Sequence, residues 1–316
     1  MNRWWKRLLP YTSLALLFIV LAASSPSFLR LENLAAVLRQ ATVVTIIAIG
    51  ATLVMIAGEI DLSVGSLAAL SGVYTAFALQ HWGSTAAGLA AGIASGALLG
   101  LMNGVITTRL LVPSFIATLG TMGVFRGWAL LVTHGVPVTD IPAAFGQISD
   151  GSLFGVLPYP VLALALATAI GYYVLGHTRL GRYCFALGSN RSACVQSGIH
   201  ARRYVLLIFV VAGAFTGLAG SIETARLISG QPTAGIGYEL DAIAAVVIGG
   251  GTLTGGEGSI FGTIAGSFVM ALIHNGTDLL GISPFVQEII IGAVIVAVVG
   301  LDELRRLRLR RTEAVV

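Results

Sequence analysis

The chain has few charged residues for its length. Only 10% of its 316 residues are Asp, Glu, Lys or Arg, 56% are hydrophobic, and the mean hydropathy is +0.91. Soluble domains carry roughly 25% charged residues, so this composition excludes an ordinary soluble domain. The alternating pattern of barrel strands is also missing. We therefore expect an all-α polytopic integral membrane protein.

Lysine is almost absent, which excludes an ATP-binding loop of the P-loop type. The single lysine, Lys6, has no G-x-x-x-x-G before it. The five histidines are scattered, and neither an H-E-x-x-H nor a G-x-S-x-G pattern occurs. The glycine-rich run 249–258 follows an apolar segment and contains no cation, so we interpret it as a tight return of the chain. We expect no catalytic set, no metal site and no cofactor bound by this chain.

Long apolar runs dominate what is present. A crossing of the bilayer core needs about 20 mostly apolar residues. We place such segments near residues 8–27, 41–58, 62–80, 84–107, 112–133, 157–176, 204–225, 241–251, 259–280 and 285–301. They form one transmembrane domain over residues 1–316, in which 62–80 and 241–251 either cross fully or dip in and return. The first segment also fits a secretory signal, but we favour an uncleaved helix because further segments follow it.

Arginine clusters orient these segments. They precede the first segment, surround the central polar stretch 177–203 and form the basic tail 302–316. Basic residues favour the cytoplasmic side, so both termini and the central stretch are expected there, with six segments before the stretch and four after it. The net charge of +4 then reflects topology and contact with anionic lipid, not nucleic acid. Cys184 and Cys194 lie on this reducing side, so we expect no disulfide between them.

A polar island at 187–199 separates two apolar blocks. Ser189 or Asn190 can cap a helix of about two turns, and Gly198 can end it. Such a helix outside the bilayer could transmit a displacement from a soluble partner to the membrane segments. A solvated loop with one helical turn is the simpler alternative.

Acidic residues interrupt the apolar pattern at two places. Glu59 and Asp61, followed by Ser63, stand between two nearly continuous segments, and Glu239 and Asp241 open a later helix of small residues. Charges at membrane depth cost roughly 2.5–3.5 kcal/mol, and interrupted segments in both halves of a chain are typical of transporters built from repeats. These residues are candidates for the translocation path or for helix caps, and for Asp61 and Asp241 we favour the cap.

Further polar residues lie inside the expected segments. Arg126 needs a carboxylate or carbonyl partner, while Asn103 and Asn275 are more typical of bridges between helices than of contacts to solute. All three remain candidates for the translocation path. Glu223 and Arg226, three residues apart on a helix, can pair with each other.

Four stretches resemble the permease subunits of ribose-type ABC sugar importers, and the resemblance runs over nearly the whole chain. They are residues 58–66, 177–190, 197–199 and 225–250. The chain departs from members that have Gly at the position of Glu59, which leaves the role of this residue and the identity of the sugar open.

The resemblance implies a multi-subunit importer of the bacterial inner membrane. Two permease copies would pair, a periplasmic binding protein would deliver a monosaccharide, and two cytoplasmic ATPases would bind ATP and Mg and drive transport. In this sequence the coupling helix that contacts the ATPase would include Gly188, Ser189, Asn190, Ser197, Gly198 and Ile199.

One rival is a secondary transporter in which Glu59, Asp61, Glu239 or Asp241 titrates or binds an ion. It explains the acids within the membrane segments, but neither the polar island nor the long motifs. A membrane-embedded enzyme lacks a catalytic set. We therefore expect a transporter subunit rather than an enzyme.

Overall fold

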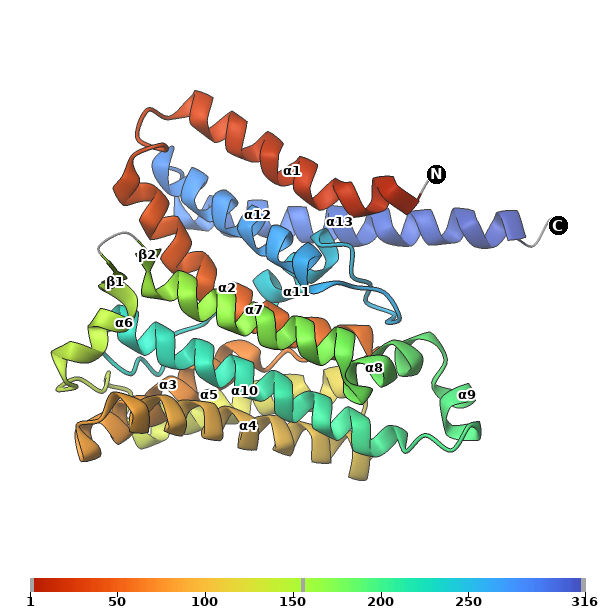
Figure 1. The fold of residues 1–316 in the computed structure, drawn as a ribbon, viewed down its shortest axis with the longest axis horizontal. Helices are drawn as coiled ribbons and strands as arrows, with labels where there is room; N and C mark the ends of the chain where they lie inside the picture. The colour runs from red at the N-terminus through yellow and green to blue at the C-terminus, as the bar shows by residue number, and fades with distance from the viewer. Residues whose placement is uncertain (1–2, 155–156, 314–316) are drawn as a thin grey trace.

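Helices packed side by side make up most of the protein (Figure 1). The computed structural model describes residues 3–154 and 157–313. Its longer helices are α1 (Arg3–Ser24), α2 (Leu31–Ile56), α3 (Val64–Trp82), α4 (Thr85–Arg109), α5 (Ser114–Val132), α7 (Tyr159–His177), α10 (Ala201–Leu227), α11 (Tyr238–Ile248), α12 (Ile260–Leu279) and α13 (Pro284–Glu313). Each apolar segment expected from the sequence overlaps one of these helices.

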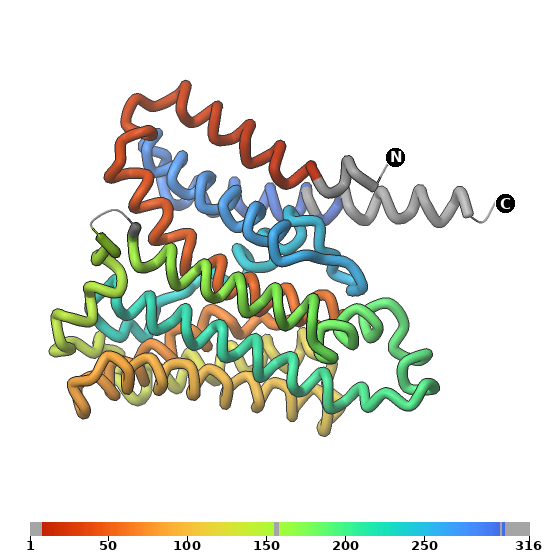
Figure 2. The backbone as a smooth tube through the Cα atoms, viewed as in Figure 1, coloured from red at the N-terminus to blue at the C-terminus, as the bar shows by residue number. Residues whose placement is uncertain are grey.

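Shorter elements lie at the two ends of the bundle (Figure 1). One end carries α8 (Arg179–Ser189) and α9 (Arg191–Gln196). The opposite end carries η1 (Ala143–Gly146), α6 (Gln147–Asp150) and an antiparallel pair of two-residue strands, β1 (Ser152–Leu153) and β2 (Leu157–Pro158), in which Leu153 is opposite Leu157. The backbone trace shows α7 leading into the α8 end and α10 leading away from it (Figure 2).

Six of the described helices are long and apolar enough to cross a membrane: α2, α4, α5, α7, α10 and α12. This supports a multi-pass membrane protein. The 11-residue α11 is about 16 Å long, roughly half of a 30 Å hydrocarbon core. The segment expected at 241–251 therefore does not cross fully as a helix.

The centre of the bundle is formed by α10, which packs against α2, α3 and α4. From Ala41 to Ala57, α2 is buried on every side, as expected for a helix that is apolar all round. Between α4 and α10 the backbones touch, because a methyl group added at Gly96 would overlap the carbonyl of Gly213, and the reverse also holds. The small residues of α4 thus allow the two helices to approach each other closely.

Two interruptions of the helical pattern meet inside the bundle. The chain leaves helical geometry between α2 and α3, where Gly58 has φ +77°. It does so again between α10 and α11, where Gly237 has φ +86°. The second interruption reaches the first, since the backbone of Gly235 lies against Gly65 in the first turn of α3. The breaks predicted from the two acidic pairs are therefore real and adjoin each other.

The basic clusters at the chain ends are only partly described. Residues 1–2 and the last three residues of the predicted basic tail 302–316 lie outside the described residues, and no side-chain contact is assigned to the rest of that tail.

Candidate coupling and translocation site

The polar stretch 177–203, which includes the island 187–199, forms two short helices with local caps. Thr178 caps α8, its hydroxyl accepting a hydrogen bond from the backbone N–H of Gly181 (3.3 Å). Asn190 caps α9 through its side-chain oxygen, which accepts from the N–H of Ala193 (2.9 Å). Gly198 ends the turn with φ +81°, a left-handed conformation that glycine adopts without strain. The expected cap at Asn190 and stop at Gly198 are confirmed.

The other candidates of the island lie around these helices. Ser189 is the last residue of α8 and not the cap, and Ser197 directly follows α9. The side chain of Ile199 packs against the main hydrophobic core, so it anchors the exit from α9.

Gly188 joins the island to the bundle through backbone contacts. A methyl group at Gly188 would overlap both the carbonyl oxygen of Ile56 and the N–H of Gly256. These two groups form a hydrogen bond of 2.8 Å with each other, and Gly255 lies against Gly58 and Gly188. The glycine-rich run 249–258 is thus the tight return expected from the sequence, and it also contacts the end of α2 and the end of α8.

An ion pair links the island to the first interruption. The carboxylate of Glu59 is 2.6 Å from a guanidinium nitrogen of Arg191, the first residue of α9. The side chain of Glu59 is 6% exposed and that of Arg191 is 50% exposed. Sequence reasoning did not find this contact. The available signal was that a buried carboxylate needs a cationic partner, and the polar stretch 177–203 supplies several arginines.

Asp61, Ser63 and Asn103 belong to one hydrogen-bond network. Ser63 donates to Asp61 from its backbone N–H (2.9 Å) and from its hydroxyl (2.6 Å). Asn103 of α4 donates to the Ser63 hydroxyl (2.8 Å) and accepts from Thr121 of α5 (2.6 Å). The prediction that Asn103 bridges helices is confirmed.

The helix-cap prediction for this interruption is wrong. Ser63 stands at the N-cap position of α3 but makes no cap hydrogen bond with its side chain. Its hydroxyl is already engaged with Asp61 and Asn103, and Asp61 accepts from the backbone N–H and the hydroxyl of Ser63, which precedes the helix. The carboxylate thus stabilises the turn before the helix instead of the first turn of the helix.

Arg126 and Glu239 lie near the second interruption. The guanidinium of Arg126 donates to the backbone carbonyls of Pro232 (2.6 Å) and Ala234 (2.7 Å), so the expected carbonyl partner is confirmed. The carboxylate of Glu239 lies beside Gly65 in the first turn of α3. A negative charge there complements the positive end of the helix dipole.

Asp241 and Asn275 make contacts with other helices. Asp241 of α11 contacts α12, and Asn275 of α12 contacts α2. Both oxygens of the Asp241 carboxylate lie close to Nε2 of His274, at 3.1 and 3.2 Å. The cap prediction for Asp241 is wrong because Gly237 occupies the N-cap and Asp241 lies within α11. Asn275 exchanges two hydrogen bonds with Asn33 of α2, which confirms the predicted bridge.

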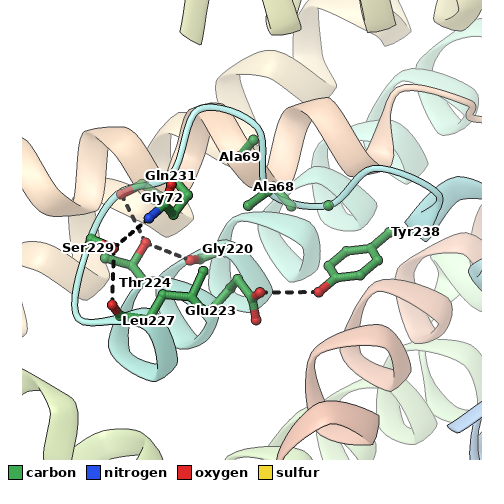
Figure 3. A pocket seen from close by; sticks show the side chains of 12 residues that line it. Ala68, Ala69, Gly72, Gly220, Glu223, Thr224, Leu227, Ser229, Gln231 and Tyr238 are labelled. Atoms are coloured by element: carbon green, nitrogen blue, oxygen red, sulfur yellow. Dashed lines mark hydrogen bonds between the residues drawn. The ribbon is translucent and has the colours of Figure 1, made fainter. Parts of the chain in front are cut away.

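Two small cavities adjoin these groups. One of about 10 Å³ lies between α3 and α10, where Glu223 accepts from the hydroxyl of Tyr238 (Figure 3). Its volume is close to the space of a single water. Glu223 also binds Arg226 with two hydrogen bonds of 2.6 and 2.9 Å, so the predicted pair is confirmed. The second cavity, of about 70 Å³, is lined in part by Gln40, Asp241 and His274.

Comparison with known proteins identifies the family. A family model described as "Branched-chain amino acid transport system / permease component" matches residues 33–299. The chain belongs to this family of transport permeases. No solved structure matches the chain.

Several curated relatives cover nearly the full length of the chain. The ribose import permease protein RbsC of Escherichia coli K12 is 41% identical over 294 residues, 92% of this chain and 91% of the relative. RbsC of Bacillus subtilis 168 is 42% identical over 298 residues, 94% and 92%. The D-allose transport system permease protein AlsC of E. coli K12 is 33% identical over 302 residues, 95% and 92%. The resemblance to ribose-type ABC permeases noted in the sequence is confirmed, and the chain is a multi-pass inner-membrane permease subunit.

Proposed function

We propose that this permease imports a monosaccharide, ribose or a related sugar, as the membrane subunit of an ATP-driven importer. One observation carries the proposal: the chain is 41% identical to a ribose import permease over 92% of its own length. Relatives named for D-allose and L-arabinose, each 33% identical, extend the class to other monosaccharides. A periplasmic binding protein delivers the sugar, and a separate cytoplasmic ATPase binds ATP and Mg.

In this proposal the ATPase docks on the coupling region 177–203. The supporting geometry is that α8 and α9 project from one end of the bundle (Figure 1). Most residues from Asn190 to Gly198 are exposed, Cys194 being buried. ATP stabilises the closed form of the ATPase pair, and the attached helices follow because the two permease states bind that form with different affinity.

The proposed topology has about ten membrane helices in a single domain, with both termini in the cytoplasm and an uncleaved first helix. Two features support it. From Leu8 onward α1 leads away from the end that carries α8 and α9, and α13 leads back toward that end (Figure 1). The arginines of the polar stretch 177–203 and of the tail 302–316 would then lie on one side of the membrane.

A second copy of the permease completes the proposed pathway, and lipid covers the remaining apolar surface. The outer face of α5 supports this arrangement, since Leu119, Val124 and Leu131 are at least half exposed. Because a sugar is neutral, we expect the residues that line the path to offer it hydroxyl and amide groups rather than charged groups.

Reconstitution tests the proposal against ion-driven transport. We expect the reading frames beside this chain's gene to encode a P-loop ATPase and a secreted binding protein. Proteoliposomes with all three proteins should take up labelled ribose or a related pentose only with internal ATP and external binding protein. The matched control is the same complex with the P-loop lysine of the ATPase replaced. Uptake by the permease alone, driven by a proton or sodium gradient, would refute the proposal.

A further inference from the structure

We propose that the Glu59–Arg191 ion pair is the positioning contact through which movement of α9 reaches α3 and α5. The inference rests on the proposed function, because it assigns the route by which the ATPase moves the membrane helices. Neither residue needs to touch the sugar or ATP.

The pair lies where the island meets the bundle. Arg191 is the first residue of α9, directly after the cap Asn190, so any displacement of α9 displaces its side chain. Glu59 belongs to the non-helical stretch between α2 and α3 and is 5% exposed. A buried carboxylate that loses its cation is strongly disfavoured. The stretch around Glu59 is therefore bound to follow Arg191.

The backbone around the ion pair is closely packed. Gly58, Gly188 and Gly255 lie in direct backbone contact, and Gly256 donates a hydrogen bond to the carbonyl of Ile56 (2.8 Å). Packed backbone transmits a displacement, because close-packed atoms have low compressibility. The ion pair adds a side-chain link between α9 and the interruption between α2 and α3.

From the interruption, hydrogen bonds continue to α5. The backbone N–H groups of Ile60 and Leu62 donate to the hydroxyls of Ser114 (3.1 Å) and Thr118 (3.0 Å), both on α5. A second route passes from Ser63 through Asn103 to Thr121. Ile60 and Leu62 are thus held by hydroxyls of α5, and Ser63 is linked to α5 through Asn103.

The receiving helix is held from one side. α5 packs chiefly against α3 and α4, while methyl groups added at Gly120, Gly123 and Gly127 would meet open space. Sliding of a helix against the helices it packs on is a common form of conformational change. The contacts therefore form a continuous series from α9, through Arg191 and Glu59, to α5.

The test measures sugar uptake per ATP hydrolysed in the reconstituted complex. Glu59→Gln keeps an oxygen for Arg191 but removes the charge, and Arg191→Gln removes the cation. We expect each to lower uptake per ATP at least about fivefold, the lower end of typical coupling between sites, while the ATPase still co-purifies. The double variant should be no worse than either single variant, and Arg191→Lys should retain part of the coupling.

Arg109→Gln is the matched control, because Arg109 is an exposed arginine at the end of α4, outside the coupling region 177–203, and forms no ion pair among the described residues. It should keep the wild-type ratio of uptake to ATP hydrolysis. A purely structural role of the pair would lower uptake and ATPase activity together, in proportion to folded complex, and would overturn the inference. Wild-type ratios in Glu59→Gln and Arg191→Gln would overturn it as well. Absence of ATP-driven uptake in the wild type would instead refute the proposed function.

Discussion

Asn33 and Asn275 exchange two hydrogen bonds between their side-chain amides, at 3.1 and 2.8 Å, although they are 242 positions apart in the chain. The pair ties the first turn of α2 to the last turns of α12. Each amide thus has both a donor and an acceptor engaged by the other.

This reciprocity predicts strong coupling between the two positions. Asn275→Ala should lower the free energy of unfolding by about 1–3 kcal/mol, because it leaves the half-buried amide of Asn33 with fewer partners. Asn33→Ala should have a similar effect, and the double variant should be clearly less destabilised than the sum of the two. Thermal unfolding of the permease in detergent measures these differences. Strictly additive effects would show that the two amides act independently.

The glycine junction at the base of the island gives a second prediction. Gly188→Ala places a methyl group against the carbonyl of Ile56 and the N–H of Gly256, which are backbone groups that cannot rotate away. Overpacking of this kind destabilises by about 1–3 kcal/mol. Gly176→Ala is the control, since a methyl group there meets open space on α7 and alanine favours a helix by about 1 kcal/mol. We expect opposite shifts of the melting temperature, and equal shifts would contradict the packing seen at Gly188.

Local signals predicted the elements of the site well. Asn190 and Gly198 mark the two ends of α9 because capping and left-handed geometry depend on neighbouring residues alone. The acidic pairs marked both interruptions of the helices for a similar reason, since charges within apolar segments are costly.

Contacts between distant segments could not be predicted from one sequence. Arg191 is one of several arginines in the polar stretch 177–203, and no local pattern shows that it, rather than Arg202, meets Glu59. Asp61 fits a cap by its position in the chain, but the cap prediction failed because α3 begins later, with Ser63 at the N-cap, and Ser63 itself donates to the Asp61 carboxylate. The length of α11 could not be predicted for the same reason, since the chain before the helix is held by the contact between Gly235 and Gly65 of α3.

The Asp61 carboxylate leads to a third prediction. Asp61 is 6% exposed and accepts two hydrogen bonds from Ser63. Asp61→Ala leaves these buried donors without an acceptor and should lower the free energy of unfolding by about 1–3 kcal/mol. Asp61→Asn retains one oxygen at the same place, so most of the stability should remain. The midpoint of thermal unfolding and the yield of folded permease measure the contrast. Equal losses in both variants would show that the negative charge itself is required.

The two native cysteines are unsuited to reporting on the position of the island. Cys194 of α9 is 6% exposed and Cys184 of α8 is fully buried. Burial also raises the pKa of the Cys184 thiol to about 12. Since the thiolate is the reactive form, at pH 8 the folded protein holds Cys184 almost entirely as the unreactive thiol. A maleimide that fails to label the wild type therefore says nothing about the side of the membrane on which the island lies.

An exposed thiol on the same helix answers that question. Val195 is 58% exposed on α9, so Val195→Cys, in a background with Cys184→Ala and Cys194→Ala, presents one exposed, reactive cysteine. Positively charged flanks predict that the island is cytoplasmic. A membrane-impermeant maleimide should then label this variant in inside-out vesicles and leave it unlabelled in intact spheroplasts. Leu153→Cys, 37% exposed at the opposite end of the bundle, should show the reverse pattern. Labelling of the Val195→Cys variant from the outside would place α9 on the side opposite the ATPase. It would thereby refute both the docking of the ATPase on α9 and the proposed role of the Glu59–Arg191 pair.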